Sequence, residues 1–250
     1  MAFQDRTAAA GLAFRQHHGG CGLRYFVEQV AAGAALLDAD GDGALDLYFP
    51  QPTALGQCRG KLPEPLRHRL FLNDGSGHFR ASEQALPNLR DYGIGAAVGD
   101  YDNDGDPDLF VACQGQSHLL QNQGDGTWHD VTSKARIDLK GFATGAAFFD
   151  YDRDGWLDLY VLRYCEWSIA TDIACPGPDG KRDVCTPLSY TPSTHVLLRN
   201  NGDGTFSNAT KAAGMKGKLG RGLSAAAADF NLDGWLDLFV SNDLARTFCT

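Results

Sequence analysis

Four short segments of the sequence crowd carboxylates at a spacing that suits metal binding. They read DADGDGALD at 38–46, DYDNDGDPD at 100–108, DYDRDGWLD at 150–158 and DFNLDGWLD at 229–237. Each has the form D-x-[DN]-x-D-G-x-x-D, which we number as positions 1 to 9 and call acidic loops 1 to 4. Side-chain oxygens at positions 1, 3, 5 and 9 and the carbonyl at position 7 can converge on one point, because the glycine at position 6 permits a sharp turn.

Oxygen ligands in this number predict Ca²⁺ at about four sites, whereas Mg²⁺ would keep more waters and demand a tighter octahedron. The alternative is that the loops are Asp/Gly turns without a metal. Asn231 lowers the ligand charge of loop 4 by one, so we expect weaker binding there. The expected ligands, with the position-7 residue contributing its carbonyl, are Asp38, Asp40, Asp42, Ala44 and Asp46; Asp100, Asp102, Asp104, Asp106 and Asp108; Asp150, Asp152, Asp154, Trp156 and Asp158; and Asp229, Asn231, Asp233, Trp235 and Asp237.

The acidic loops are not EF-hands. An EF-hand loop carries a Glu at position 12 and lies between amphipathic helices. Here position 12 is Phe49, Val111, Val161 or Val240, and the flanking segments are strand-like. The sequence therefore predicts a calcium loop carried by a β-hairpin, in which the ion fixes the hairpin and its binding energy contributes to folding.

The charge of the chain agrees with bound cations. The formal net charge is −9, and 15 of the 31 acidic residues stand at the expected ligand positions. Four calcium ions would bring the net charge close to zero. An acidic chain argues against a nucleic-acid partner, and the sequence contains no apolar run of the roughly 20 residues that a membrane span needs.

The acidic loops belong to a larger repeat. Small residues precede each loop (GAALL, GAAVG, GAAFF and SAAAA), and an apolar strand follows it (LDLYFP, PDLFVA, LDLYVL and LDLFVS). A second hairpin signature alternates with the first, at 69–79, 118–128 and 195–206, and its Asn/Gly/Asp stretch is interpreted as a simple turn. We expect first hairpins over 33–50, 95–113, 145–163 and 224–242, with the small residues crowded around a central axis.

Units of two hairpins repeating at this interval predict an all-β fold, a β-propeller of four-stranded blades. Residues 1–250 would form a single propeller with about four blades, interrupted by a loop insertion at 164–194. Residues 3–12 align with 206–215, which predicts a lone outer strand at the N-terminus. That strand could close a four-bladed ring; the favoured interpretation is a piece of a larger propeller with open sheet edges.

The repeats resemble FG-GAP/VCBS-type calcium-binding propeller repeats and, more specifically, the cartilage acidic protein / ASPIC–UnbV family. The resemblance rests on FQDRTAAAGLAF, the G-A-A…D-x-D-x-D-G-x-x-D-L blocks, NNGDGTFSNATKAAG and CPGPDGKRDVCTP. It implies a propeller of about seven blades outside the cell, in the periplasm or at the cell surface, although no secretory signal opens the chain.

Seven cysteines occur in the chain, without any C-x-x-C motif. Cys175 and Cys185 flank a Pro/Gly/Asp loop and are the best disulfide candidates, with two free thiols as the alternative; the family resemblance also implies this bridge. The pairing of the others stays open, namely Cys21, Cys58, Cys113, Cys165 and Cys249.

Three functions compete at this stage. The first is an adhesion or protein-interaction module with structural calcium, which binds an unidentified protein or glycan. The second is a lectin, for which Trp128, Trp156, Trp167 and Trp235 could stack on sugars; packing beside the metal loop is the favoured explanation, because Trp156 and Trp235 occupy equivalent loop positions. The third is an enzyme with its site on the 164–194 loop; none of the nucleophile, zinc or phosphate-loop motifs occurs, so we expect no catalytic activity.

Overall fold

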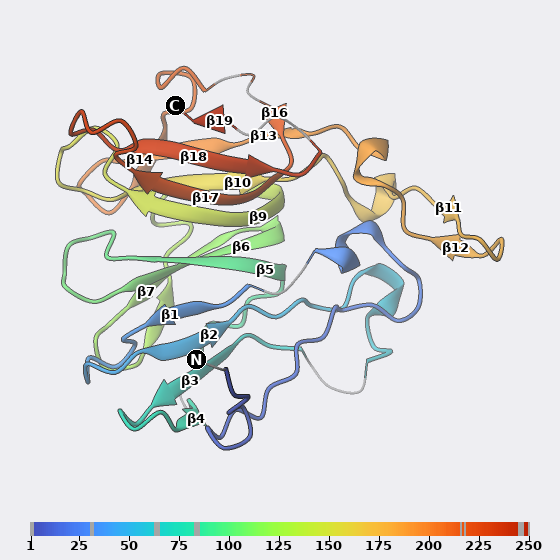
Figure 1. Ribbon diagram of the computed structural model, residues 1–250, viewed down its shortest axis with the longest axis horizontal. Helices are drawn as coiled ribbons and strands as arrows, with labels where there is room; N and C mark the ends of the chain where they lie inside the picture. Colours follow the sequence, from blue (N-terminus) through green and yellow to red (C-terminus); the bar gives the residue numbers. More distant parts are fainter. Residues whose placement is uncertain are drawn as a thin grey trace.

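The computed structural model describes residues 3–30, 33–62, 66–82, 86–215, 217 and 219–244, and the backbone of 248–249. The described chain is all-β, with four blades fanning around a common axis as a partial β-propeller (Figure 1). The strands of each predicted hairpin occur where the repeat places them, so the predicted fold class is confirmed.

Each blade pairs its strands in antiparallel order. The blades contain β1 (Ala35–Leu37), β2 (Asp46–Phe49), β3 (Arg69–Asn73) and β4 (Phe79–Ala81); β5 (Tyr92–Gly99), β6 (Asp108–Gln116), β7 (His118–Asn122) and β8 (Trp128–Asp130); β9 (Lys140–Phe149), β10 (Asp158–Arg163), β14 (Val196–Asn200) and β15 (Phe206–Asn208); and β17 (Gly222–Ala228), β18 (Asp237–Asn242) and β19 (Phe248–Cys249). We call these blades 1 to 4. β6 also pairs with β9, which joins blades 2 and 3 into one sheet.

The small residues of the innermost strands permit close approach at the axis. A Cβ added to Gly33 would lie 2.6 Å from the carbonyl oxygen of Ile94, and one added to Gly95 would lie 2.3 Å from that of Thr144. Both distances are shorter than any tolerated contact, so the G-A-A signature is explained by crowding between neighbouring blades.

Apolar side chains fill the spaces between blades. One buried cluster contains Leu37, Tyr48 and Leu109 of blades 1 and 2, and further clusters join blades 2 and 3 and blades 3 and 4. The outer face of blade 4 lacks such a neighbour in the described chain. Phe239 of β18 is 42% exposed, whereas its counterpart Phe110 of β6 is fully buried.

The predicted N-terminal strand is wrong. Residues 3–12 form no strand; their Thr7–Gly11 segment is a turn, and the Ala10 carbonyl accepts a hydrogen bond from the Phe79 N–H at the edge of β4. The alignment with 206–215 reflects the turn that follows an outer strand, since Met215 N–H closes the same turn on Thr210. The N-terminus lies beside blade 1, away from blade 4, so it does not close a ring (Figure 1).

Residues 164–194 leave blade 3 and return to it, and part of this segment projects from the fan (Figure 1). The segment contains η3 (Ile169–Thr171), the β11–β12 hairpin (Cys175–Pro176 and Arg182–Asp183), η4 (Pro187–Ser189) and β13 (Ser193–Thr194), which pairs with β16 (Leu219–Gly220). Its Trp167 and Tyr190 pack with Phe26 of η1 (Phe26–Gln29) in an aromatic cluster. The insertion therefore covers one end of the core.

Two disulfides tie these peripheral segments. Cys175–Cys185 closes the β11–β12 hairpin, as expected from the Pro/Gly/Asp loop. Cys21–Cys58 joins the segment before η1 to η2 (Gly56–Cys58), a pairing that the sequence left open. Cys113 and Cys165 are buried free thiols.

A charged histidine links three elements of blade 2. His118, at the start of β7, donates from Nδ1 to Asp130 of β8 (2.9 Å) and from Nε2 to Asp91, which precedes β5 (3.0 Å). Burial disfavours the charge, but the hydrogen bonds and attraction of Asp130 and Asp91 outweigh it and raise the pKa of His118 to about 9. Both ring nitrogens are thus committed to carboxylates.

We predict that this bridge stabilises blade 2 only while His118 is charged. Because its pKa is raised on folding, the contribution is complete below the unfolded value of about 6.5 and is lost as the pH rises through about 9. Replacement His118→Gln should lower the free energy of unfolding by about 2 kcal/mol near neutral pH, after allowance for partly exposed carboxylates. Urea unfolding across this pH range measures the difference. His129→Gln, which replaces an exposed histidine on β8, is the control. If His118→Gln lowered the free energy of unfolding by the same amount above pH 9 as near neutral pH, the assignment would be contradicted.

Candidate metal centre

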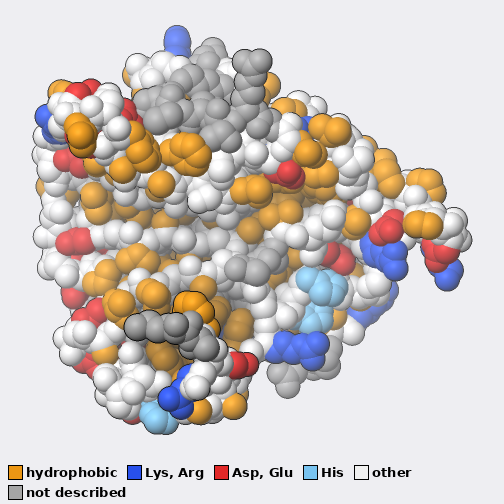
Figure 2. Space-filling view, in the orientation of Figure 1, with side chains coloured by type: hydrophobic (Ala, Val, Ile, Leu, Met, Phe, Trp, Pro, Cys, Tyr) orange, Lys and Arg blue, Asp and Glu red, His pale blue; other side chains and the backbone are white. Residues whose placement is uncertain are grey.

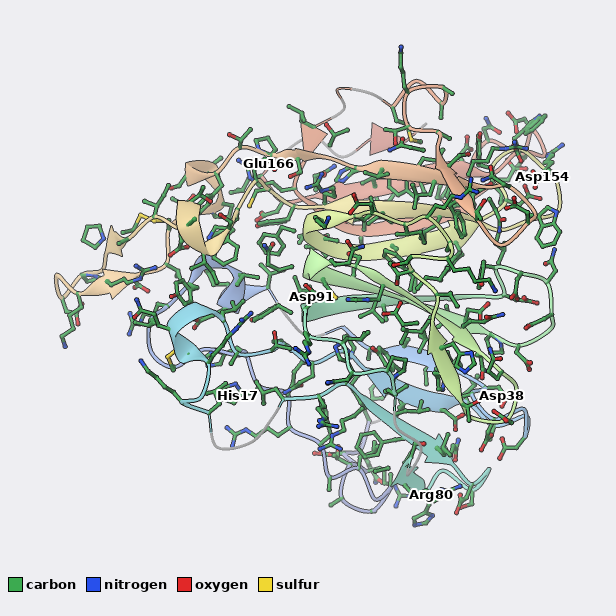
Figure 3. The ribbon with its side chains drawn as sticks, turned by 180° about the vertical axis from the view of Figure 1, so that it is seen from behind. His17, Asp38, Arg80, Asp91, Asp154 and Glu166 are labelled. Atoms are coloured by element: carbon green, nitrogen blue, oxygen red, sulfur yellow. A yellow bond between two sulfur atoms is a disulfide. The ribbon has the colours of Figure 1, made fainter. Side chains whose placement is uncertain are left out.

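The four acidic loops join the first two strands of each blade and lie along one edge of the fan. Loop 1 connects β1 to β2, loop 2 β5 to β6, loop 3 β9 to β10 and loop 4 β17 to β18. Acidic side chains are spaced along this edge in Figure 2, and Asp38 and Asp154 mark it in Figure 3. The propeller thus places the four predicted sites side by side.

The position-1 carboxylate organises each loop. In loop 2, Asp100 accepts the N–H groups of Asp104 (3.1 Å) and Gly105 (3.0 Å), and loops 1, 3 and 4 repeat these two bonds. The position-5 carboxylate in turn accepts the position-7 N–H, as Asp104 does from Asp106. The backbone at position 4 has positive φ in every loop, including 55° at Asn103 and 63° at Arg153. The loops therefore share one conformation.

Three loops bring carboxylates together. Carboxylate oxygens lie within 4.8 Å of one another in a group from each of loops 1, 2 and 3. The groups are Asp38, Asp40 and Asp42; Asp100, Asp102 and Asp108; and Asp150, Asp152 and Asp158. Loops 2 and 3 thus use positions 1, 3 and 9, while loop 1 uses positions 1, 3 and 5. Asp46, Asp104 and Asp154 lie outside these groups.

The fully described loop 4 forms no such group of three carboxylates. Asn231 occupies position 3, and its amide donates to the position-5 carboxylate of Asp233 (3.0 Å), while its oxygen accepts the Asp233 N–H. The amide therefore uses both of its polar atoms within the loop, which gives a physical reason for expecting weaker binding there.

The position-3 carboxylates fit a cation. The Oδ1 atoms of Asp40, Asp102 and Asp152 are all buried without a hydrogen-bond partner. A buried acceptor left unpaired is unfavourable by roughly 1–3 kcal/mol, and more for a charged group. The same orphaned atom in three equivalent loops indicates a shared missing partner. Clustered hard oxygen donors, with no nitrogen or sulfur among them, suit Ca²⁺.

Position 9 is the most deeply buried of the acidic positions. Asp46, Asp108 and Asp158 are fully buried, and each accepts the N–H of the position-2 residue of its own loop. Burial, partly offset by these hydrogen bonds, raises the pKa of Asp108 to about 8 and that of Asp158 to about 6. A cation nearby would favour the ionised forms.

Comparison with protein families returns a match that covers most of this architecture. The FG-GAP-like repeat model matches residues 65–111, 100–161 and 178–240, together more than half of the chain. The chain belongs to the FG-GAP-like repeat family. The three matches span acidic loops 2, 3 and 4, so the FG-GAP assignment rests on the same repeat that carries the carboxylates.

Comparison with solved structures returns a lectin of Agrocybe aegerita, described in terms of its recognition of non-reducing terminal N-acetylglucosamine. The two are 17% identical with a TM-score of 0.39, and the match covers 84% of this chain and 47% of the lectin chain. The FG-GAP chain thus spans about half the length of that structure. Comparison of the FG-GAP chain with curated proteins returns no match.

The predicted site residues do not include one asparagine in each of FG-GAP blades 1 to 3 that contacts the acidic loop. Asn73, Asn122 and Asn200 end the third strands, and their N–H groups donate to the position-9 carboxylates of Asp46, Asp108 and Asp158 at 2.7–2.9 Å. Their side-chain oxygens also cap the following turn, as predicted for a simple hairpin. The recurrence of Asn in RLFLN, HLLQN and VLLRN was the available signal, but turn chemistry explained it already.

In blades 2 and 3, the residue before this asparagine contacts position 3 of the acidic loop. Gln121 donates to Asp102 Oδ2 (2.6 Å), and Arg199 donates to Oδ2 of both Asp152 (2.6 Å) and Asp154 (2.8 Å). The aliphatic Leu72 stands at this place in blade 1. Loop 3 therefore carries a built-in positive charge that loops 1 and 2 lack.

The tryptophans offer little surface for stacking on sugars. Trp128 and Trp167 are buried, and Trp167 donates to Asp172 (2.6 Å). Trp156 packs against Gly202 of the neighbouring turn. Trp235 of loop 4 is half exposed, with the Arg153 guanidinium 3.8 Å above its ring. Packing beside the loops accounts for these residues better than repeated sugar pockets.

The charged residues in and beside the 164–194 segment make structural contacts. Glu166 accepts from Ser193 (2.5 Å) and lies 3.8 Å from Arg163, whose guanidinium also donates to the Lys140 carbonyl (3.1 Å). Arg182 pairs with Asp172. These contacts hold the insertion on the core.

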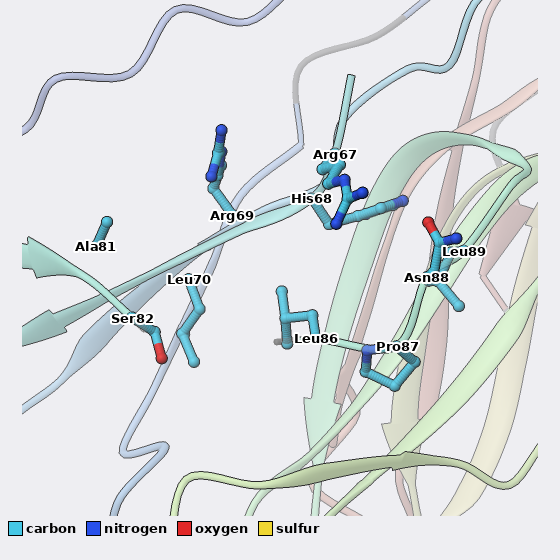
Figure 4. Close-up of a pocket in the computed structure, with 10 residues that line it drawn as sticks. All are labelled: Arg67, His68, Arg69, Leu70, Ala81, Ser82, Leu86, Pro87, Asn88 and Leu89. Carbon is cyan, nitrogen blue, oxygen red and sulfur yellow. The ribbon is translucent and has the colours of Figure 1, made fainter. Parts of the chain in front are cut away.

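A separate cavity of about 230 Å³ lies in blade 1, at the end of β3 opposite Asn73 (Figure 4). Its described lining includes basic but no acidic side chains, so it does not suit a cation. The lining residues are Arg67, His68, Arg69, Leu70, Ala81, Ser82, Leu86, Pro87, Asn88 and Leu89.

We predict that Arg199 lowers the calcium affinity of loop 3. Replacement Arg199→Leu, which copies Leu72, should raise this affinity about two- to fivefold, because it removes a positive charge that competes with the cation for Asp152 and Asp154. Terbium luminescence sensitised by Trp156 reports loop 3 when Asp229→Asn removes a loop 4 ligand near Trp235. Arg80→Leu on β4 controls for the lost charge. A weaker loop 3 site would contradict the prediction.

Proposed function

We propose that the chain is a calcium-stabilised β-propeller that acts as an adhesion or protein-interaction module. The observation that carries the proposal is the repetition, in three successive loops, of converged carboxylates with a buried, unpartnered position-3 oxygen. A bound Ca²⁺ supplies positive charge to carboxylates that otherwise repel one another. The residues that would hold it are those of the three converged groups, with the more weakly binding loop 4 as a fourth site.

The role proposed for calcium is structural. Each loop joins two strands of a blade, and in blades 1 to 3 its position-9 aspartate also holds the third strand through the Asn73, Asn122 or Asn200 N–H. Fixing the loop therefore fixes three strands of the blade. Binding to the folded chain alone converts affinity into folding free energy.

An interaction role is favoured over catalysis. FG-GAP propeller repeats are typically non-catalytic, His118 has both ring nitrogens occupied by carboxylates, and the insertion residues hold structure. A lectin function remains the second candidate; the half-exposed Trp235 at the loop edge is the observation that favours it.

The proposed location is extracellular, periplasmic or at the cell surface. Disulfides Cys21–Cys58 and Cys175–Cys185 persist in oxidising compartments, and calcium is plentiful outside cells. None of the described helices is long and apolar enough to cross a membrane. We further propose membership of the cartilage acidic protein / ASPIC–UnbV group, supported by the CPGPDGKRDVCTP segment.

Chelation should lower the melting temperature steeply. A site filled at about 100 times its Kd contributes about 2.7 kcal/mol, and 1 kcal/mol corresponds to about 2–4 °C for a chain of this size. Each filled site should therefore add about 5–10 °C. Calorimetry with Ca²⁺ and with excess EGTA measures the shift in melting temperature. Asp102→Asn should remove only the part of this shift that loop 2 contributes. Superimposable melting curves in the two buffers would rule out the calcium proposal.

The partner class is tested by screening the chain against glycans and extracellular proteins, with Ca²⁺ and with EGTA. An interaction module should bind protein in calcium, and a lectin should bind a glycan. Trp235→Ala should reduce glycan binding alone if that ring stacks on a sugar. Binding to neither class in either buffer would refute both functions.

A further inference from the structure

Two buried asparagines each contact two neighbouring acidic loops. The side-chain amide of Asn200 donates to the carbonyls of Leu157 in loop 3 (3.1 Å) and Tyr101 in loop 2 (2.7 Å). Its backbone N–H donates to Asp158 of loop 3 (2.8 Å). One fully buried residue therefore satisfies a ligand carboxylate of one loop and a backbone carbonyl of the preceding loop.

Asn122 repeats this arrangement one blade earlier. Its N–H donates to Asp108 of loop 2 (2.9 Å), and its amide donates to the Pro107 carbonyl in loop 2 (3.3 Å) and the Ala39 carbonyl in loop 1 (3.2 Å). Residue 39 and residue 101 both hold position 2 of their loops. The link is thus a repeated feature of the interface between blades.

Asn73 provides a natural comparison. It makes the same bonds within blade 1, to Asp46 (2.7 Å) and to the Leu45 carbonyl (3.0 Å). In the described chain no blade precedes blade 1, so this asparagine serves one loop only. Asn73 therefore shares the bonds that Asn200 makes within its own blade and lacks the bond between blades; it is also partly exposed, whereas Asn200 is fully buried.

Position 4 adds direct contacts between loops. Asn103 of loop 2 donates to the Gly155 carbonyl of loop 3 (3.0 Å), and Arg153 of loop 3 stacks on Trp235 of loop 4. Both Asn103 and Arg153 have positive φ, a conformation that few residues other than glycine and asparagine adopt. Loops 2 and 3 are therefore joined twice, by Asn200 and by Asn103.

We propose that Asn122 and Asn200 couple neighbouring loops, so that calcium binds them cooperatively. The asparagine can satisfy two carbonyls and a carboxylate only when both loops hold their positions. An ion that orders loop 2 fixes the Tyr101 carbonyl, and this carbonyl holds the Asn200 amide in place. Loop 3 then loses less conformational entropy when it binds its own ion. This inference rests on the proposed calcium function.

A double-mutant cycle tests the coupling between loops 2 and 3. Terbium titration measures the affinity of loop 3 through luminescence sensitised by Trp156, in a chain that also carries Asp229→Asn. Asp100→Asn weakens loop 2, and by linkage it should lower the terbium affinity of loop 3 by about fivefold or more. Asn200→Ala should remove most of this effect of Asp100→Asn, leaving the part carried by Asn103, and Asn73→Ala should leave the whole effect intact. A general loss of stability would shift loop 3 affinity without removing the linkage.

Asn103→Gly keeps the test decisive where Asn200→Ala does not fold. It removes the second contact while preserving the positive φ, and it should reduce the linkage. The coupling is overturned if Asp100→Asn leaves the loop 3 affinity unchanged, or lowers it equally with and without Asn200→Ala. Failure of terbium to bind at all refutes the calcium function itself, and the coupling with it.

Discussion

The structure depends on a carboxylate buried at the end of each of blades 1 to 3. The position-9 aspartates, Asp46, Asp108 and Asp158, lie out of contact with solvent, where an unpaired charge is highly unfavourable. Each is tolerated because two N–H groups donate to it, one from its own loop and one from the asparagine that ends the third strand. The loop, the first hairpin and the third strand are therefore fixed by one side chain.

The other carboxylates of the acidic loops are the reason for proposing a cation there. Hydrogen bonds satisfy the position-1 and position-5 aspartates within the loop, but they do not remove the repulsion among several charges. Gln121 and Arg199 each hold one oxygen of a position-3 aspartate and leave the other buried without a partner. The strands thus orient the loop carboxylates before any ion arrives, which reduces the ordering that binding requires.

The sequence predicts the blades because a repeat carries several independent signals at once. Small residues, an acidic loop and an apolar strand recur in one order, so a mistake in one copy is corrected by the others. Single-copy features lack this support. Residues 3–12 resemble an outer strand but form a turn on β4, because the match lay in the turn. The Cys21–Cys58 bridge spans 37 residues without a motif.

The asparagine links escaped prediction for a different reason. Asn122 and Asn200 look like turn residues, and they do cap turns with their side-chain oxygens. Their amide nitrogens carry the second role, and those bonds run to a carbonyl 83 or 99 residues away. Because turn capping alone accounts for an asparagine at these positions, a single sequence gives no signal of its long-range bonds.

Polar links between blades provide what the apolar clusters cannot. Leucine, valine and phenylalanine fill the spaces between blades, but dispersion and burial are non-directional and tolerate many similar packings. A buried amide that must meet two carbonyls and cap a turn tolerates one arrangement, because each displaced bond leaves a polar group unsatisfied. The interface between blades therefore draws its stability from the apolar clusters and its register from Asn122 and Asn200. Because these asparagines lie against the acidic loops, the element that aligns the blades is also the one closest to the charge that calcium would change.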